Sequence, residues 1–596
     1  MKCTIVWFRR DLRIFDHGPL HRAARRGLVV PVFILDRALL EHPEIGVARV
    51  AFMLECLRSL HKDLRNRGGR LIIRYGDPVD ILPKLVRETQ AEGIYAHVDF
   101  ERIYGRVRDA RLNRALADQG MKIRWFEPPG TTPDLVAYPN YRDLWYSQMQ
   151  EPIIPAPIRV AVPDSIRSAW LEEGRSHLSA NISDPIPTVE DLGFTADDKV
   201  IPPGGIHSAR KMLQEFLTRK TKSYYWQLSY PGATATSGLS PHIKFGVISV
   251  RECYQTTQAF LSTLAPLNSP WADSTASQGR NQKVKRSCRQ FISRLRWGSG
   301  FTQRFRYLPQ LEVRSLYTIF DDDGWDFNDR LYEAWQIGQT GFPIIDAAAR
   351  CLEATGGWKE LNFRVRAIYS SFLSNLMGMD WRYGALHFMQ HLIDGDCPID
   401  HYQWAMQSGV THCLDKTWTR IYNPGQAAVN RCDPNGVFIR RWLPELANVP
   451  IETLGAPPRL KDYPPPMLDY REARQHRVEQ LESQRKNVLT VENVLPFLAR
   501  LPESVEPFGT DTCMAQVNQR YPSDIQWYST LSPELFPAAL DLDNLVEEEA
   551  IALRTWFVAH VDIKLHRSRA RSQAGVGRDR FRSVKVHDGV EQLNLW

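Results

Sequence analysis

The chain has 596 residues, a net charge of +7, 43% hydrophobic and 24% charged residues, and nine scattered cysteines with no Cys-x-x-Cys pair. This length exceeds what one hydrophobic core serves, so two or three domains are expected. The cysteine spacing disfavours disulfide frameworks, zinc ribbons and iron–sulfur centres, and it indicates a reducing compartment. Early charges such as Lys2 and Arg9 disfavour a signal peptide, and there is no run of eighteen apolar residues, so we expect a cytoplasmic, monomeric protein without a membrane span.

The first 130 residues alternate short apolar runs with helical patterns, most clearly at 47–66. Strands that alternate with helices indicate a parallel sheet with helices on its faces, so residues 1–130 are predicted to form a doubly wound α/β domain. The first strand is not followed by Gly-x-Gly-x-x-Gly, which gives no support for dinucleotide binding there. The predicted strands are 3–8, 28–35, 70–75, 93–98 and 122–126.

Three further segments follow the α/β domain. Prolines become frequent and periodicity weakens over 131–204, which is predicted to be a connector. Helical periodicity dominates 205–485, which is predicted to be an all-α domain, with a solvent loop at the Ser-, Asn- and Gly-rich insert 264–287. The extension 486–596 carries a basic stretch with few apolar residues, typical of a disordered tail that serves either solubility or weak nucleic-acid contact.

Four separated motifs, in this order along the chain, resemble those of the photolyase/cryptochrome flavoproteins. They are WFRRDLR at 7–13, TSGLSPH at 236–242, the segment 335–346 that includes Gly-Phe-Pro, and the tryptophan- and acid-rich segment 381–442. The resemblance covers about residues 1–485. It implies an FAD-binding helical domain behind an α/β domain, and light-driven electron transfer as the activity.

The hydroxyl-rich loop is a candidate phosphate site. Its hydroxyls and backbone N–H groups come at a predicted helix start, which suits an anion such as a pyrophosphate, although an ordinary helix N-cap is the alternative. Together with Tyr224 upstream, the resemblance implies that this loop holds the diphosphate of FAD. The loop residues concerned are Thr236, Ser237, Gly238, Leu239 and Ser240.

Acidic residues after a predicted helix are candidates for the flavin ring and its ribose. The resemblance implies that Asp394 and Asp396 hold these parts, that Arg366 pairs with Asp394, and that Asn362 lies in the same region. A buried Arg–Asp pair is costly unless it is well paired, so a cofactor role is favoured over stability alone.

Trp404, Trp381 and Trp325 match the family's chain of three tryptophans. Indole is easily oxidised, so a row of indoles can carry electrons between a buried flavin and the surface. In a protein with seventeen tryptophans, three core tryptophans are the alternative. The resemblance implies that Trp404 is nearest the flavin, Trp381 is in between and Trp325 is at the surface.

Asp400 occupies what resembles the position that faces the reactive nitrogen of the flavin. Repair members usually have Asn there, and plant-type cryptochromes have Asp. A carboxyl group kept protonated by burial can donate a proton to the reduced flavin, whereas Asn can only hydrogen-bond. Asp400 is therefore either a photochemical proton donor or an acceptor in a polar network, and we favour the first.

The helix that corresponds to the family's lesion pocket departs from the usual pattern. Gln290 replaces a glutamate, Ser293 a tryptophan, and Ala367 a methionine. Gln290 can still hydrogen-bond, and Trp297 can supply an aromatic face to an extruded base. Basic residues near this helix and near the C-terminal motif indicate a DNA-facing surface, although solvated or ion-paired arginines are the alternative. They are Arg294, Arg296, Arg304, Arg306, Arg440 and Arg441.

The second chromophore of the family is less clearly supported. Residues 100–102 resemble a segment at its site, but Tyr104 lies where a folate-binding glutamate is usual, and His17 lies where an asparagine is common. A folate- or deazaflavin-type antenna therefore remains only an option.

We expect a lyase that splits cyclobutane pyrimidine dimers in single- or double-stranded DNA by electron transfer from light-excited, reduced FAD. The alternative is a cryptochrome-type photoreceptor, which Asp400 and the C-terminal extension favour. A non-photochemical flavoprotein or a structural nucleic-acid binder is a distant third possibility.

Overall fold

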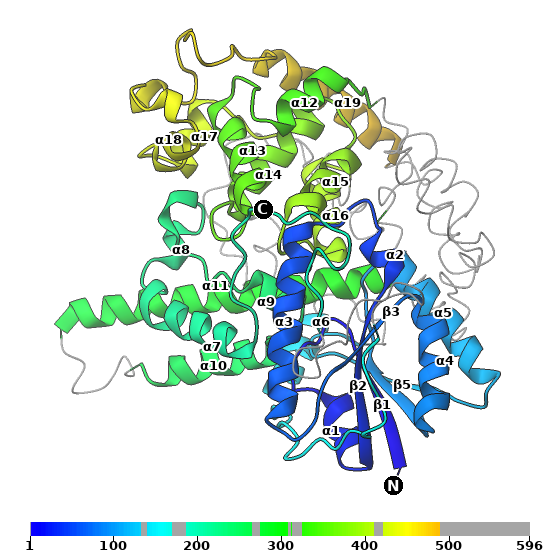
Figure 1. Ribbon diagram of the computed structural model, residues 1–596. Coiled ribbons are helices and arrows are strands. Elements are labelled where there is room, and N and C mark those ends of the chain that lie inside the picture. Colours follow the sequence, from blue (N-terminus) through cyan, green and yellow to red (C-terminus); the bar gives the residue numbers. More distant parts are fainter. Residues whose placement is uncertain are drawn as a thin grey trace.

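The computed structural model describes residues 2–132, 140–169, 186–264, 274–307, 312, 325–410 and 421–488. Figure 1 shows the strands grouped at the lower right, with helices above and beside them. The extension is predicted to span 486–596; its first residues belong to the helix that ends at Val488, and the rest, with the basic tail, lies outside the described residues.

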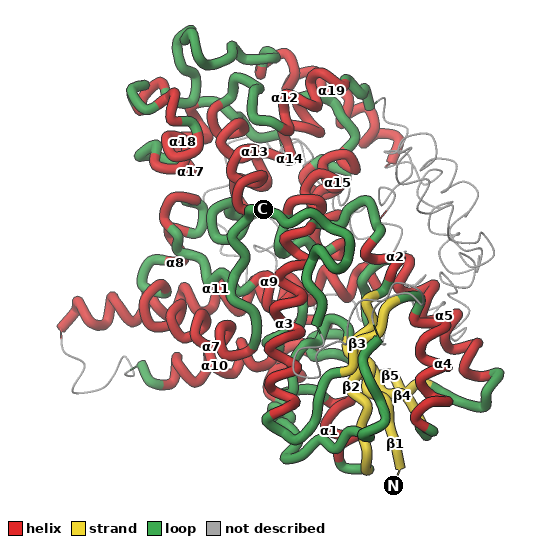
Figure 2. The backbone as a smooth tube through the Cα atoms, viewed as in Figure 1, coloured by secondary structure: helices red, strands yellow, loops and turns green. Residues whose placement is uncertain are grey.

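A parallel sheet of five strands, ordered β3-β2-β1-β4-β5, forms the N-terminal part. Figure 2 shows that helices cover both sides of this sheet. The chain moves outward from β1 to β3 and then returns to β4 beside β1. The carboxyl ends of β1 and β4 therefore flank the switch point at which open parallel sheets place ligands. The strands are β1 (Lys2–Phe8), β2 (Gly27–Leu35), β3 (Ile72–Tyr75), β4 (Gly93–His97) and β5 (Ile123–Phe126).

The central strands are apolar on both faces because helices cover both faces. Six of the seven residues of β1 are buried, and so are the last seven residues of β2. All five strands lie where the sequence predicts them. The covering helices are α1 (Gly18–Ala24), α2 (Arg37–Leu40), α3 (Val47–Arg65), α4 (Pro78–Thr89) and α5 (Ile103–Ala117).

Helices are the main regular structure in the rest of the described chain, which confirms the predicted fold class of an α/β domain plus an all-α domain. The helical core gathers apolar side chains of α13 to α18 around Trp335, Trp381 and Trp404. The α-helices are α6 (Asn140–Gln150), α7 (Ile206–Glu215), α8 (Tyr224–Gln227), α9 (Ser240–Lys244), α10 (Val250–Ser262), α11 (Ser274–Tyr307), α12 (Asp329–Gln336), α13 (Pro343–Thr355), α14 (Phe363–Ser371), α15 (Trp381–His391), α16 (Cys397–Gln407), α17 (Gln426–Cys432), α18 (Val437–Trp442) and α19 (Tyr470–Val488).

Two predictions need adjustment. The solvent loop predicted at 264–287 is wrong for its second half, because α11 already begins at Ser274. Its polar residues weaken helix propensity, but Val284 and Cys288 are buried four residues apart, and this packing outweighs propensity. The predicted connector 131–204 contains α6, which packs against α10 and α11. None of the described helices is long and apolar enough to cross a bilayer.

Candidate flavin site

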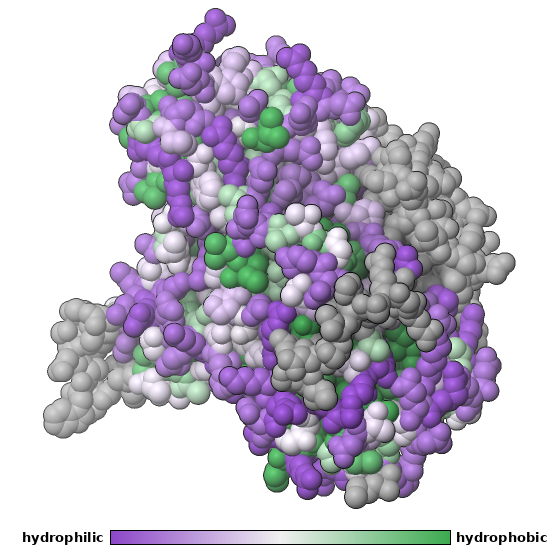
Figure 3. Space-filling model, viewed as in Figure 1, coloured by the Kyte–Doolittle hydropathy of each residue, from purple (hydrophilic) through white to green (hydrophobic). Residues whose placement is uncertain are grey.

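Two adjoining cavities bring most of the predicted site residues together. The helical cavity, of about 280 Å³, lies among α9, α14 and α16. The interdomain cavity, of about 470 Å³, shares part of that wall and extends past α11 to the strand ends of the α/β domain. In the view of Figure 3, apolar side chains gather near the middle of the molecular surface, between two largely hydrophilic regions. Predicted residues on these walls are Tyr224, Thr236, Ser237, Gly238, Leu239, Ser240, Arg294, Trp297, Asn362, Arg366, Asp394, Asp396, Asp400 and Trp404.

The hydroxyl-rich loop forms one end of the helical cavity. Gly238 has φ +72°, and a Cβ there would lie 2.8 Å from the Lys359 Cε, so the loop needs glycine at this point. The Lys220 ammonium donates to the Thr236 carbonyl at 3.0 Å, and Lys359 also lines the cavity. Because α9 has only five residues, the attraction for an anion comes mainly from hydroxyls and these two lysines.

An arginine–aspartate pair lies at the centre of the shared wall. The guanidinium of Arg366 contacts both carboxylate oxygens of Asp394 at 3.3–3.4 Å, and it also donates to the carbonyl groups of Leu361 and Gly357. Asn362 begins the same helix as its N-cap, with its side-chain oxygen accepting from two backbone N–H groups. The pair therefore has a fixed geometry on a helix whose start is capped.

Several buried polar atoms on these walls have no hydrogen-bond partner within the described residues. They are Asn362 Nδ2, Asp396 Oδ1, Asp400 Oδ2 and Trp404 Nε1. A buried polar group without a partner is costly, so a group of them around one cavity indicates a polar ligand. A flavin nucleotide carries acceptors and donors along its whole length, and the residues present therefore fit FAD.

Asp400 lies in the first turn of α16, on the shared wall of both cavities. Burial raises the pKa of its carboxyl group to about 7; the neighbouring His401 opposes this rise, and Glu44 adds to it. The Asp400 carboxyl group can therefore keep its proton to a higher pH than an exposed aspartate, as a proton donor requires.

The three predicted electron carriers share the helical core, but only one of them lines a cavity. Trp404 does so, Trp381 is fully buried, and Trp325 is partly buried under the guanidinium of Arg477 at 4.6 Å. The segment of Trp325 lies beside the turn before Trp381, since the Asp326 N–H donates to the Gly378 carbonyl. Trp404 on the cavity wall and Trp325 nearer the surface are the two ends that the predicted electron route requires. The order of electron transfer along the three tryptophans stays a prediction.

The α11 side of the interdomain cavity holds an aromatic–basic cluster that the sequence did not single out. Two guanidinium groups lie near the ring of Phe363, that of Arg294 at 4.4 Å and that of Arg364 at 5.1 Å. The sequence feature that could have identified Phe363 as a site residue is its position between Asn362 and Arg366. Sequence alone, however, does not show which way its ring points.

Some of the other residues predicted for the lesion pocket or for the DNA-facing surface line a cavity, and others do not. Trp297 lies on the cavity wall with Arg294, whereas Gln290 is not among the lining residues. Ala367 lines the helical cavity. Arg296 donates to the Tyr146 hydroxyl at 2.7 Å, and Arg306 pairs with Glu127 at 2.9 Å, so these two arginines have partners within the protein.

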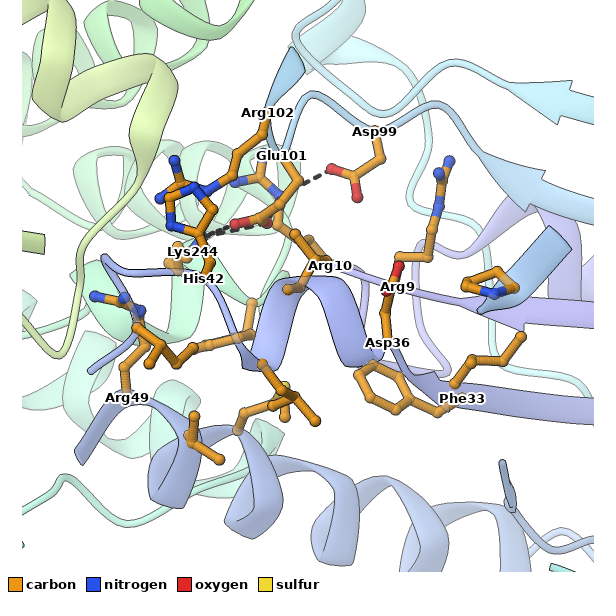
Figure 4. A pocket seen from close by; sticks show the side chains of 18 of the residues that line it. Arg9, Arg10, Phe33, Asp36, His42, Arg49, Asp99, Glu101, Arg102 and Lys244 are labelled. Atoms are coloured by element: carbon orange, nitrogen blue, oxygen red, sulfur yellow. Dashed lines mark hydrogen bonds and ion pairs between the residues drawn. The ribbon is translucent and has the colours of Figure 1, made fainter. Parts of the chain in front are cut away.

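A third, smaller cavity lies in the α/β domain at the carboxyl ends of β1 and β2 (Figure 4). We call it the sheet cavity. One wall is apolar, with Phe33, Leu40 and Met53 among its residues, and the other carries many charges. The dashed lines of Figure 4 mark ion pairs on this wall, including that between Lys244 and Glu101.

Tyr104 and His17, which replace residues usual at the family's folate site, both use their polar atoms in hydrogen bonds within the protein. The Tyr104 hydroxyl donates to Asp36 at 2.9 Å. The ring of His17 contacts Asp11 at 2.9 Å and accepts from the Leu20 N–H at 3.0 Å. Both side chains stabilise the domain itself.

Asp11, His17 and His97 are close enough to hold a metal ion. Their ligand atoms, however, already contact one another at hydrogen-bond distances of 2.7 and 2.9 Å. The guanidinium groups of Arg9 and Arg13 flank the cluster, which opposes a cation. The cluster is therefore explained by hydrogen bonding.

Comparisons with known proteins agree with this geometry. Residues 4–131 match the family model for DNA photolyase, and residues 291–483 match that for the FAD binding domain of DNA photolyase. The chain is 31% identical to a deoxyribodipyrimidine photo-lyase of Synechococcus, over 81% of this chain and 96% of that protein. It is 30% identical to Cryptochrome-1 of Arabidopsis thaliana, over 76% of this chain and 64% of that protein.

Two solved structures share the fold. A bacterial class III photolyase from Agrobacterium tumefaciens superimposes with a TM-score of 0.66 at 24% identity, covering 82% of this chain and 98% of its own. An archaeal photolyase from Sulfolobus tokodaii, solved with two FAD molecules, superimposes with a TM-score of 0.64 at 25% identity, covering 81% of this chain and 100% of its own.

Proposed function

The chain belongs to the photolyase/cryptochrome family, and from this premise we propose that it is a blue-light-driven, FAD-dependent DNA repair enzyme that splits cyclobutane pyrimidine dimers. One observation carries the proposal: the interdomain cavity, of about 470 Å³, continues from the predicted flavin residues Arg366 and Asp394 to the aromatic side chain of Trp297 on α11. A photoreceptor needs a flavin cavity, but it does not need an adjoining cavity lined by Trp297, Phe363 and Arg294.

Each wall has a distinct task in this proposal. FAD, when bound, supplies the light absorption and the electron that is lent to the dimer and returned. Arg366 and Asp394 fix the cofactor, while the loop around Ser237 and the nearby lysines hold its phosphates. Trp297 and Phe363 offer aromatic faces to the extruded bases, and the Arg294 guanidinium balances phosphate charge.

A surface patch outside the cavity supports DNA as the partner. On α8, Trp226 is 42% exposed, and the Tyr225 ring lies 4.0 Å from the guanidinium of Arg286 on α11. Lys283 lies 5.8 Å from the Trp226 ring. Exposed aromatic rings among cations are typical of single-strand binding, because bases stack on the rings while cations balance phosphates. Positions 283, 286, 290, 294 and 297 follow one stripe of α11, which leads from this patch to the cavity.

A photoreceptor is the second candidate, and Asp400 is the observation that favours it. A carboxyl group with a pKa near 7 beside the flavin suits light-driven proton transfer. In that case the region after residue 488 would carry the signal to a partner.

Repair of defined oligonucleotides tests the proposal. Full-length protein with reduced FAD is illuminated with blue light together with dimer-containing single- and double-stranded DNA, and loss of dimer is measured by chromatography. We expect light-dependent repair of at least one strand form. Trp297→Ala should lower the repair rate while leaving bound flavin unchanged, and Phe327→Ala, at an exposed aromatic residue before α12, serves as the control. Failure on both strand forms, with normal flavin photoreduction, would favour the photoreceptor.

The sheet cavity is our proposed site for a second, light-harvesting chromophore with a flat ring. Its apolar wall and its place at the strand ends support this. The archaeal relative with two FAD molecules shows that the fold can accept a second chromophore. Extraction of the purified protein should then yield a second pigment besides FAD, which absorbance spectroscopy and mass spectrometry would identify.

A further inference from the structure

A buried chain of four charged side chains ties the first turn of α16 to the α/β domain. His401, the neighbour of Asp400, has its Nε2 3.0 Å from a carboxylate oxygen of Glu44. Arg102 pairs with the other oxygen of Glu44, and also with Glu312 at 2.8 Å. All four side chains are buried. Asp400, the proposed proton donor to the flavin, is therefore the sequence neighbour of a residue that contacts the α/β domain.

The charges along this chain alternate only if His401 is protonated. A neutral ring would remove the positive charge that lies 3.0 Å from the buried Glu44 carboxylate, and a buried carboxylate that loses a nearby cation is destabilised. Burial opposes the charge on the ring, but the Cys397 sulfur and the Glu44 carboxylate outweigh it and raise the pKa of His401 well above its ordinary value. The contact with the Glu44 carboxylate therefore favours the protonated form of the His401 ring.

The other charges around Asp400 are already engaged. Arg366 pairs with Asp394, so their effects on Asp400 largely cancel. Arg49, labelled in Figure 4, donates to backbone carbonyl groups that include that of Leu392. The charged groups that face Asp400 from its own and neighbouring elements are His401, Glu44, Arg49, Arg366 and Asp394.

We propose that His401 is a positioning residue for Asp400: its imidazolium, held by Glu44, fixes the first turn of α16 against the α/β domain and limits how tightly Asp400 holds its proton. The proposal rests on the proposed place of Asp400 beside the flavin, but the proton affinity of Asp400 can be measured without light or DNA. A nearby opposite charge lowers the pKa of a carboxyl group by about 1–3 units. Without this cation Asp400 should keep its proton to higher pH.

Infrared titration tests this directly. FAD-loaded, full-length protein labelled with ¹³C-aspartate is titrated in the dark, and Asp400→Asn identifies the band of the protonated carboxyl group. His401→Gln keeps a hydrogen-bond donor for Glu44 but has no charge, and it should raise the apparent pKa of Asp400 by about 1 unit. A band that titrates at the same pH as in the unaltered protein overturns the proposal.

His387→Gln is the matched control, because His387 is also buried, on α15, and burial holds the pKa of its ring well below the ordinary value. Removing this uncharged ring should leave the Asp400 titration unchanged. A shift of equal size in both variants would show that loss of packing, and not loss of charge, moves Asp400, and it would overturn the proposal.

A second measurement needs no variant. Nitrogen-15 NMR of labelled histidine in the unaltered protein should show an imidazolium ring that persists at pH 8, and absence of any such ring overturns the proposal even if His401→Gln does not fold. Failure of DNA repair or of photoreduction, with both spectroscopic results as expected, would count against the proposed function alone.

Discussion

The sheet cavity and the helical cavity differ in what their carboxylates contact. Each carboxylate on the sheet cavity has a cation as its partner. Asp396, beside the interdomain cavity, and Asp400, beside both the helical and the interdomain cavity, instead each keep one buried oxygen without a hydrogen-bond partner in the described chain. The pairs around the sheet cavity are Asp36–Arg108, Glu44–Arg102, Asp99–Arg10 and Glu101–Lys244.

This difference separates carboxylates that are already held in ion pairs from carboxylates that keep one oxygen for a ligand. An unsatisfied buried polar atom costs about 1–3 kcal/mol, so the helical cavity gains when a polar ligand fills it. The carboxylates of the sheet cavity offer little such gain, because each of them already pairs with a cation, so the chromophore proposed there would gain mainly from the apolar wall. Arg10 connects the two regions, since it pairs with Asp99 on one side and with Asp396, at 3.0 Å, on the other.

The largest expected effect comes from replacing one arginine beside each cavity with alanine. Arg366→Ala leaves Asp394 without its cation and should weaken FAD binding by about 100-fold or more, measured by fluorescence titration of the apoprotein. Arg108→Ala, in the sheet cavity, should keep FAD affinity but lower the free energy of unfolding by about 3–5 kcal/mol, because it leaves Asp36 buried without a cation. Equal FAD affinity in both variants would contradict the comparison.

The next effect concerns two buried tryptophans of the same core. Trp404→Phe should nearly abolish photoreduction of oxidised FAD by an external reductant, measured by absorbance under blue light, because it removes the indole on the cavity wall. Trp335 is as buried and lies 6.3 Å from Trp404, but its indole N–H already donates to the Tyr369 carbonyl. Trp335→Phe should therefore keep most of the photoreduction, and equal losses in the two variants would argue against a route that starts at Trp404.

Sequence predicted the sheet well, and most of the residues that it singled out for the flavin line one pair of cavities, because both follow from local patterns. Five apolar runs gave five strands, and the motif residues around Ser237, Arg366 and Asp394 line one pair of cavities. It could not predict contacts that depend on side-chain direction or on the docking of two domains. The ring of Phe363 near two arginines and the contact of His401 with Glu44, 357 positions apart, are of this kind.

A smaller effect is a change in how stability depends on pH. Folding raises the pKa of Asp400 from its ordinary value to about 7, so between about pH 4 and 7 the folded protein binds more protons than the unfolded chain. Stability therefore falls as pH rises through this interval. Asp400→Asn removes this loss. The change that it causes in the free energy of unfolding of the apoprotein should be more favourable at pH 8 than at pH 4 by roughly 2 kcal/mol, measured by denaturant unfolding.

The matched control for this effect is Asp99→Asn, on the sheet cavity. Burial opposes ionisation of Asp99, but Arg10 and other nearby cations lower its pKa in the folded protein. Its carboxylate therefore stabilises the protein at neutral pH and loses this contribution as pH falls below its ordinary pKa. Asp99→Asn should destabilise the protein at pH 8. The same sign of change in both variants would show that the two cavities do not differ in their need for a ligand.

The smallest effect lies outside both cavities, on the surface patch of α8 and α11. Trp226→Ala should weaken binding of a dimer-free single-stranded oligonucleotide by about 5- to 10-fold, since each stacked base contributes about 1–3 kcal/mol. Arg286→Ala should instead lower the dependence of the binding constant on salt, by about one phosphate contact. Phe327, which is 40% exposed, is the control aromatic residue. If Phe327→Ala weakened binding as much as Trp226→Ala, measured by fluorescence anisotropy, the patch would have no special part in DNA binding, and the cavities alone would have to supply the affinity.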